Sequence, residues 1–210
     1  MTLMETMKRT AIVLAVASIF GSGLVALSYE ITAERIAANE RAILLRSLNV
    51  LIAPEQRDND LYADSGEMMD EGILGTANPV TIYRARKNGQ PVAAVLTASA
   101  PDGYNGTIRL LVGIDYNGTL VGVRVISHQE TPGLGDKIEE RRSEWILSFT
   151  GRSLTDPTED GWKVKRDGGI FDQFTGATIT PRAVVKAVYR TLLFYQQHRD
   201  EIFVQKADSE

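Results

Sequence analysis

The residues of this sequence best suited to chemistry lie between positions 172 and 188, in the run DQFTGATITPRAVVKAV. Three threonines lie close together there: Thr175, Thr178 and Thr180. The pair Thr180-Pro181 predicts the start of a helix, because threonine is a good N-cap and proline fits the first helical position. One capping threonine would be enough, so the other two hydroxyls call for an explanation.

The start of that helix is suited to binding an anion. The free N–H groups of a first helical turn and the positive end of the helix dipole favour a group such as phosphate. Gly176 and Ala177 carry little bulk, so a ligand could approach the backbone there, within reach of the Thr178 hydroxyl. A capped helix with spare threonines would explain the same residues, and the spacing alone leaves both readings open.

Composition excludes several kinds of chemistry. The 210 residues contain no cysteine, which removes disulfides, thiolate nucleophiles and Cys-ligated zinc or iron–sulfur clusters. The two histidines, His128 and His198, lack the spacing of paired metal or haem ligands. A net charge of -4 argues against a nucleic-acid partner, which would require a basic face.

A second loop combines glycines with a lysine at residues 133–137, GLGDK. These are residue types that cradle phosphates, but the loop fits neither the dinucleotide-binding pattern nor the P-loop pattern. Taken by itself, it is interpreted as a connection between a strand and a helix.

The N-terminus predicts a membrane anchor. Residues 10–29 carry no charge, and a helix needs about 20 residues to cross the hydrocarbon of a bilayer. Lys8 and Arg9 precede this run and Glu30 follows it, so the positive-inside rule places the N-terminus in the cytoplasm. The alternative is a signal peptide cleaved near residues 26–28, although the apolar run exceeds the roughly 7–15 residues usual for one.

A helix is predicted to continue beyond the membrane as a stalk over residues 31–52. It ends with an apolar flank suited to docking: Ile43, Leu44, Leu48, Leu51 and Ile52. Residues 54–79 show no sustained period and are predicted to form an irregular connection.

Four strands are predicted next, as two hairpins in a meander. VTIYRARK and PVAAVLTAS flank Asn88-Gly89, while TIRLLVGID and TLVGVRVIS flank Asn117-Gly118. Asn-Gly between alternating apolar runs favours a tight hairpin, because both residues accept a positive φ. The alternation gives strands an apolar face, formed by Ile108, Leu110, Val112 and Ile114 in one strand and by Val121, Val123 and Val125 in the next.

Helices are predicted over residues 138–149 and from Pro181 to about Phe203, with another strand over residues 162–166. The last helix has an apolar stripe of Val184, Val185, Val188, Leu192 and Tyr195, and an opposite basic row of Arg182, Lys186 and Arg190 that is interpreted as a solvated face. The predicted fold is α+β: an N-terminal transmembrane helix, then one extracytoplasmic domain with an antiparallel sheet and packed helices.

Three features together resemble one protein family. The run from Asp172 to Thr178 matches D-x-x-[ST]-G-A-T, the motif on which a flavin transferase esterifies FMN through its phosphate. HQETPGLGDKIE, at residues 128–139, is similar to the family segment HxETPGLGxKxE, and KRDGGIFDQFTGATITPRAVVKAV is close to the family's C-terminal signature. With its single anchor, the chain resembles the G subunit of the Rnf electron-transport complex along nearly its full length.

The resemblance implies a covalently attached FMN and assigns residues to it. Thr178 would be the esterified residue, and Asp172 would belong to the signal that the transferase recognises. The other residues implied to surround the cofactor are Thr175, Gly176, Ala177, Thr180, His128, Glu130, Thr131, Gly133, Leu134, Gly135 and Lys137, the last of them near the phosphate. No catalytic or metal-binding residue is implied.

The implied function is that of an electron carrier without turnover of its own, because a flavin accepts single electrons without a metal. The family places the domain on the periplasmic side of a bacterial inner membrane. Its neighbours there would be membrane, iron–sulfur and flavin subunits of an NADH:ferredoxin or flavodoxin oxidoreductase that moves sodium ions or protons. The chain would then divide into a cytoplasmic N-terminus (1–9), a transmembrane helix (10–29), a stalk helix with an irregular connection (30–78) and an FMN-binding domain (79–210).

Three alternatives stay open. The first is the equivalent flavin-carrying subunit of the sodium-translocating NADH:quinone reductase, which is related and shares the flavin motif. The second is an anchored extracytoplasmic binding or scaffold module, in which the threonine-rich turn only caps a helix. The third is a hydrolase with a threonine nucleophile and His128, for which the sequence offers no orienting acid or oxyanion donors that we can place.

Overall fold

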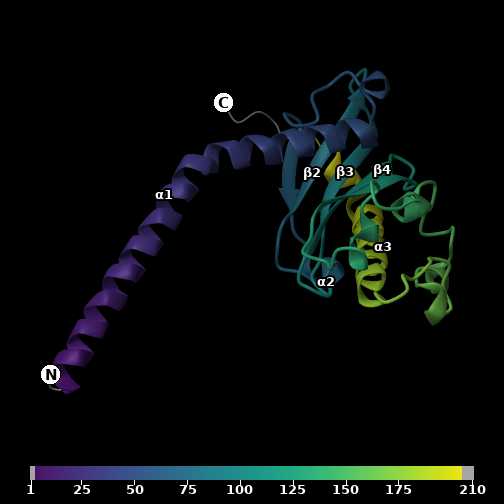
Figure 1. Cartoon of the computed structure of the whole chain (residues 1–210). Helices are drawn as coiled ribbons and strands as arrows, with labels where there is room; N and C mark the ends of the chain where they lie inside the picture. The colour runs from purple at the N-terminus through teal and green to yellow at the C-terminus, as the bar shows by residue number, and fades with distance from the viewer. Residues whose placement is uncertain (1–2, 205–210) are drawn as a thin grey trace. The chain divides into compact units, whose positions relative to one another are not determined.

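The computed structural model describes residues 3–204, which divide into two compact units at Ile43 and Leu44 (Figure 1). The first unit consists of the greater part of helix α1 (Leu3–Leu51). Its most apolar stretch has a mean hydropathy of 2.2 and is not buried within the chain. Large apolar side chains such as Phe20 are exposed, as expected for a surface that faces lipid. Among the described residues, α1 is the one helix long and apolar enough to cross a membrane.

The second unit contains a five-stranded antiparallel sheet with strand order β1-β2-β3-β4-β5. Its strands are β1 (Ser65–Met68), β2 (Val80–Lys87), β3 (Gln90–Ala100), β4 (Ile108–Asp115) and β5 (Leu120–Ser127). The four predicted strands are therefore confirmed, as is the α+β class. The prediction of an irregular connection over residues 54–79 is wrong in part. That segment contains β1, the one-turn helix α2 (Glu71–Leu74) and the 3-10 turn η1 (Pro54–Gln56), which are too short to show a period.

Two predicted elements after the sheet are wrong in kind. Residues 138–149 do not form an α-helix. They begin at the end of the 3-10 turn η2 (Gly135–Ile138), pass through a non-helical stretch over 139–143 and end in the 3-10 turn η3 (Glu144–Phe149). Ser143 separates them: its hydroxyl donates to the Lys137 carbonyl at 2.9 Å and accepts from the Trp145 N–H at 3.1 Å. It thus caps a new turn where a helix would have continued.

The predicted strand over residues 162–166 is also absent. Trp162 and Val164 are buried there, but Val164 forms only an isolated bridge with Phe171. Two further 3-10 turns, η4 (Glu159–Gly161) and η5 (Lys165–Asp167), flank these residues. Gly168 has a φ of 89° and turns the chain back on itself, so the segment is held by its own folded loop rather than by the sheet.

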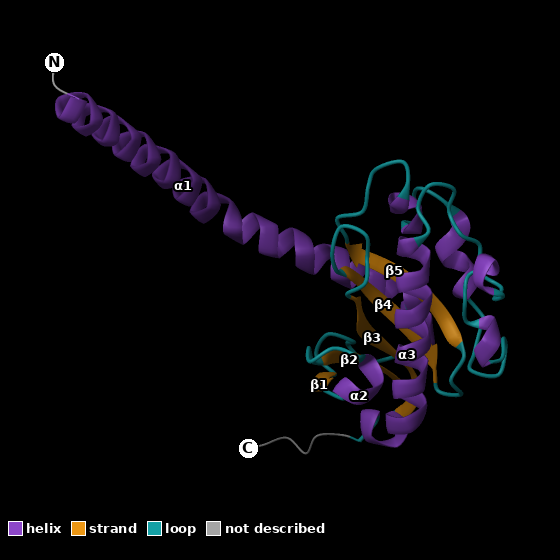
Figure 2. Ribbon diagram, turned by 90° about the horizontal axis from the view of Figure 1, so that it is seen from below, coloured by secondary structure: helices purple, strands orange, loops and turns teal. Residues whose placement is uncertain are grey.

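The final helix, α3 (Ile179–Ile202), runs across one face of the sheet (Figure 2). Its predicted apolar stripe is buried, and so are the predicted core side chains of β4. The other face of the sheet packs against the last turn of α1 and the residue after it, through Leu48, Leu51 and Ile52. This confirms that the apolar flank ends by docking, although Ile43 remains 51% exposed.

Two glycines on neighbouring strands allow this docking. Gly113 and Gly122 are register partners in β4 and β5, and a Cβ on Gly122 would lie 3.1 Å from Cδ2 of Leu51. The helix end can therefore come close to the sheet because side chains are missing beneath it. A bulge at the same point leaves Val121 without a register partner. Val121 is only half-buried, whereas Val123 is buried, so the predicted alternation of β5 holds only in part.

The two hairpin turns differ from each other. Asn88 and Gly89 both have a positive φ, of 53° and 73°, as predicted. In the second turn only Gly118 does, with a φ of 92°, so the prediction for Asn117 is wrong. The second connection is longer, since β4 ends at Asp115 and β5 begins at Leu120, and a longer loop does not need two left-handed residues.

His198 ties α3 to α2. Its Nε2 lies 3.0 Å from Oδ2 of Asp70, and its Nδ1 lies 3.1 Å from Oε2 of Glu201. Burial lowers the pKa of His198, but these hydrogen bonds raise it more, and the net shift is upward from 6.5. The bond from His198 is also the main cause that lowers the pKa of Asp70.

We expect this contact to make stability depend on pH. Its contribution is fully present below pH 6.5, the ordinary pKa of histidine, and is lost as the pH rises through the raised pKa of His198. In detergent, the full-length protein should therefore unfold at a higher temperature than the variant His198→Gln. This difference in unfolding temperature should shrink between about pH 6 and about pH 9. An equal difference at both pH values would contradict the prediction.

Candidate functional site

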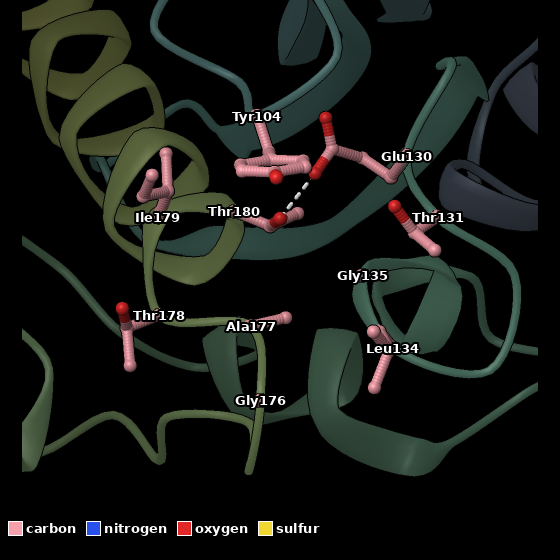
Figure 3. Close-up of a pocket in the computed structure, with 10 residues that line it drawn as sticks. All are labelled: Tyr104, Glu130, Thr131, Leu134, Gly135, Gly176, Ala177, Thr178, Ile179 and Thr180. Carbon is pink, nitrogen blue, oxygen red and sulfur yellow. Dashed lines mark hydrogen bonds between the residues drawn. The ribbon is translucent and has the colours of Figure 1, made fainter.

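A cavity of about 350 Å³ lies where three loops meet at one end of the sheet. This volume is within the range of ~300–1,000 Å³ that is typical of small-molecule sites. Tyr104 lines it from the turn between β3 and β4. Glu130, Thr131, Leu134 and Gly135 line it from the loop after β5, and residues 176–180 line it from the start of α3 (Figure 3).

The sheet brings these loops together. In an antiparallel sheet the end of β3, the start of β4 and the end of β5 lie at the same end of the sheet. The register shows this, because Ala100 pairs with Ile108 and Arg109 pairs with Ser127. The start of α3 lies at the same end. Figure 3 shows Thr178 on the opposite side of the cavity from Glu130, Thr131 and Leu134.

Glu130 links the three loops. Its side chain is buried, with 4% exposed. One carboxylate oxygen accepts a hydrogen bond from the hydroxyl of Thr180, and the other accepts from the backbone N–H of Asn105 at 3.1 Å. Both connections cross from one wall of the cavity to another, so this carboxylate fixes the relative positions of the walls.

His128 accepts a hydrogen bond from the backbone of Glu130. The backbone N–H of Glu130 donates to Nδ1 of His128 at 3.0 Å, so Nδ1 is the acceptor and Nε2 donates to Glu139 at 2.8 Å. Arg141 binds the same Glu139 carboxylate. The pKa of Glu139 is lowered to about 2, mainly by the hydrogen bonds from Arg141 and further by the bond from His128. Partial burial of Glu139 opposes this shift. His128 is thus held in a fixed orientation.

Thr180 is not the N-cap that the sequence predicted. Helix α3 begins at Ile179, its N-cap position is Thr178, and the Thr178 hydroxyl makes no capping hydrogen bond. The reason is tertiary, because Glu130 takes the hydroxyl of Thr180. Pro181 still lies in the first turn, where its missing N–H has no helical partner to lose.

The turn that carries Thr178 is tight and depends on a glycine. Ala177 donates to the Phe174 carbonyl at 3.2 Å, and Gly176 has a φ of 82°. A Cβ at Gly176 would also lie 3.2 Å from Cδ2 of Leu134. The backbone therefore passes close to the opposite wall, and Thr178 is left half-buried at the edge of the cavity.

An aromatic cluster supports this turn from below. It consists of Trp145, Phe149, Trp162, Phe171 and Phe174, which meet in stacked, tilted and edge contacts. Nε1 of Trp145 donates to the Asp172 carbonyl at 2.7 Å. The irregular segment before Thr178 is therefore held by side chains rather than by a strand or helix.

Eight of the residues that the sequence assigned to the cofactor line the cavity: Glu130, Thr131, Leu134, Gly135, Gly176, Ala177, Thr178 and Thr180. The other five, Asp172, Thr175, Gly133, Lys137 and His128, do not line it. Asp172 is exposed and pairs with Lys165 at 2.6 Å.

Sequence reasoning missed Tyr104 and Ile179, which also line the cavity. Ile179 precedes the helix start that the sequence predicted at Pro181. Tyr104 lies in the turn PDGYNG and is 64% exposed. An aromatic residue in an otherwise polar turn was the available signal.

The arrangement suits an organic phosphate. Backbone N–H groups of the first turn of α3 have no partners within the helix, and the Thr178 hydroxyl lies beside them. The cavity walls are partly apolar. Two of the lining residues, Gly135 and Gly176, are glycines, whose missing side chains leave room. A Cβ at Gly135 would lie 2.9 Å from both Glu130 Oε2 and Thr180 Oγ1. Within residues 3–204 there is no group of three or more His, Asp or Glu side chains that could hold a metal ion.

Removing the Thr180 hydroxyl should destabilise the protein. The variant Thr180→Ala leaves a buried carboxylate oxygen of Glu130 without its donor, a loss of about 1–3 kcal/mol in the free energy of unfolding. The variant Thr180→Ser keeps a hydroxyl and should lose less. Chemical denaturation of the two variants measures the difference, and equal midpoints would show that the hydrogen bond to Glu130 does not stabilise the fold.

The chain is similar to known proteins over nearly its whole length. Residues 1–51 match the family described as RnfG N-terminal region, and residues 103–193 match the FMN-binding domain family. The chain is 48% identical over 200 residues to the G subunit of the ion-translocating oxidoreductase complex of Vibrio cholerae, with 95% of each chain covered. Proteins of the same name are 46% identical in Aliivibrio fischeri over 200 residues, covering 95% of each chain, and in Vibrio atlanticus over 203 residues, covering 97% of each.

Proposed function

Because the chain belongs to the RnfG family of ion-translocating oxidoreductase complexes and contains an FMN-binding domain, we propose that it carries FMN as a phosphoester on Thr178. In this proposal the attached flavin relays electrons between other subunits of the complex. The observation that carries it is the position of Thr178, whose hydroxyl lies at the start of a helix and at the edge of a cavity of about 350 Å³.

The contacts around Thr178 support its role as the attachment site. The three threonines of the motif differ in their surroundings. Thr180 is buried and bonded to Glu130, whereas Thr175 is exposed and does not line the cavity. Thr178 alone of the three is both accessible and part of the cavity wall, so a transferase could reach it while the attached flavin still lies in the cavity.

When bound, FMN supplies the ability to take up and release single electrons. The residues of the chain bind and orient it. The first turn of α3 offers N–H donors to the phosphate, and Leu134, Ala177 and Ile179 offer apolar surface. Tyr104, whose ring lies above Thr180 in Figure 3, can cover the flavin from the turn between β3 and β4 and keep water away from it.

The residues outside the cavity are assigned supporting roles. Asp172, exposed and paired with Lys165, is proposed to be read by the flavin transferase. Thr175 and Gly133 shape the two loops, and His128 fixes the orientation of Glu130. Lys137 is proposed to contribute positive charge near the phosphate.

The length and composition of α1 support a membrane anchor. We propose that residues 10–29 span the inner membrane, with the basic residues Lys8 and Arg9 on the cytoplasmic side. The FMN-binding domain then lies in the periplasm, where a covalent bond retains the flavin independently of its free concentration. There it would meet the membrane, iron–sulfur and flavin subunits of an NADH:ferredoxin or flavodoxin oxidoreductase coupled to sodium or proton transport.

The test uses full-length protein made in a host with an active flavin transferase. After denaturation and electrophoresis, the band should fluoresce as a flavin, and the same flavin in native membranes should be reduced when the complex is supplied with its electron donor. A non-fluorescent band in a host that flavinylates its other targets would end the proposal of a covalent carrier. A fluorescent band whose flavin stays oxidised during turnover would end the proposal of a relay.

A further inference from the structure

Glu130 is an anion built into the wall of the cavity. It is 4% exposed, and both hydrogen bonds to its carboxylate come from neutral donors, the Thr180 hydroxyl and the Asn105 N–H. Each carboxylate oxygen thus has a hydrogen-bond partner that supplies no counter-charge. Within residues 3–204 no lysine, arginine or histidine forms an ion pair with it.

The backbone confines this carboxylate closely. A Cβ at Gly103 would lie 3.1 Å from Oε1 of Glu130, and a Cβ at Gly135 would lie 2.9 Å from Oε2. Glycines on two sides therefore admit the carboxylate, and its hydrogen bonds hold it there. It has no room to turn towards bulk water, so its charge acts on the cavity through a poorly screening environment.

We propose that Glu130 sets the redox behaviour of this site by lowering the reduction potential of the flavin in the cavity. The inference rests on the proposed function. The step concerned is the addition of an electron to the flavin, with no bond of the chain made or broken. The added charge is repelled by the fixed carboxylate, so the reduced form is destabilised relative to the oxidised form. A potential held low in this way keeps the flavin a good electron donor to its partner.

The experiment is a redox titration of the flavinylated full-length protein with dithionite, followed by its visible absorbance. The test variant is Glu130→Gln. Its amide is nearly isosteric, and because the Thr180 hydroxyl can also accept a hydrogen bond, both contacts can be kept while the charge is removed. The midpoint potential should shift to a more positive value.

The matched control is Asp102→Asn. Asp102 lies on the turn that carries Tyr104, but its side chain is 58% exposed and pairs with Lys186 at 2.6 Å. The control removes the same formal charge from a solvated position, where screening is strong, so its potential should stay at the wild-type value. A shift as large as that of Glu130→Gln would show that net charge, and not the buried position, is responsible.

A second variant serves if Glu130→Gln does not take up flavin. Glu130→Ala removes the same charge without placing an amide in the wall, so its midpoint potential should also become more positive. Mass spectrometry of the peptide with Thr178 and thermal unfolding check each variant first. Flavin absent from Thr178 in the wild type would contradict the proposed function, whereas bound flavin with an unchanged midpoint potential in a folded variant would overturn the role of Glu130 alone.

Discussion

The variant Thr178→Ala is expected to lose its covalent flavin completely while keeping its fold. The hydroxyl is the only atom of this side chain that can form a phosphoester, and it makes no capping hydrogen bond whose loss would weaken α3. In-gel fluorescence should fall from a clear band to background, and the mass of the peptide with residue 178 should show no added flavin mononucleotide. Thermal unfolding of the variant should match that of flavin-free wild-type protein.

Thr175→Ala is the matched control for this result. Thr175 lies in the same motif, is exposed and does not line the cavity, so its loss should leave flavin on Thr178. Fluorescence that survives in Thr178→Ala would move the attachment site. Buried Thr180 and exposed Thr175 would then have to be tested by the same peptide analysis.

The second large effect is expected at the centre of the aromatic cluster. Phe149 is fully buried, stacks on Phe171 with 4.6 Å between ring centroids, and meets Trp145 edge-on at 5.3 Å. Truncating such a residue costs about 3–5 kcal/mol, because burial is lost and a cavity remains. Phe149→Ala should therefore lower the free energy of unfolding by that amount and reduce flavinylation, since the cluster holds the segment that leads to Thr178.

Phe203→Ala is the control for Phe149→Ala. Phe203 is half-buried at the end of α3, where its ring lies 5.5 Å from that of Tyr116. Its truncation should cost less and leave flavinylation at the wild-type level. Denaturant unfolding and the ratio of flavin to protein absorbance measure both effects. Equal losses in the two variants would show that the aromatic cluster has no particular role in presenting Thr178.

Elements with a strong local pattern were predictable. The four strands from Val80 to Ser127 alternate or carry continuous apolar runs between turn residues, and their bounds agree with the structure to within a residue. The stripe of α3 has a helical period over many turns. In both cases the pattern is repeated often enough that local preference and burial favour the same structure.

Elements built from short turns and side-chain contacts were not predictable. The stretch from residue 138 to residue 149 looks helical in composition, but Ser143 caps a new turn there. Residues 162–166 look like a strand, but Trp162 joins the aromatic cluster and Val164 forms only an isolated bridge with Phe171. Short 3-10 turns carry no period, so a one-dimensional pattern cannot distinguish them from fragments of helix or strand.

The sequence by itself determined the membrane-length helix, the meander of strands and the position of the flavin motif before the last helix. It did so because hydrophobic period, turn chemistry and short motifs are local properties of the chain. Only the tertiary structure decided which threonine is free. Glu130 lies 50 residues from Thr180 along the chain, and its carboxylate takes that hydroxyl. Thr178 is left at the edge of the cavity because a buried carboxylate must be satisfied by whichever donor the fold brings to it.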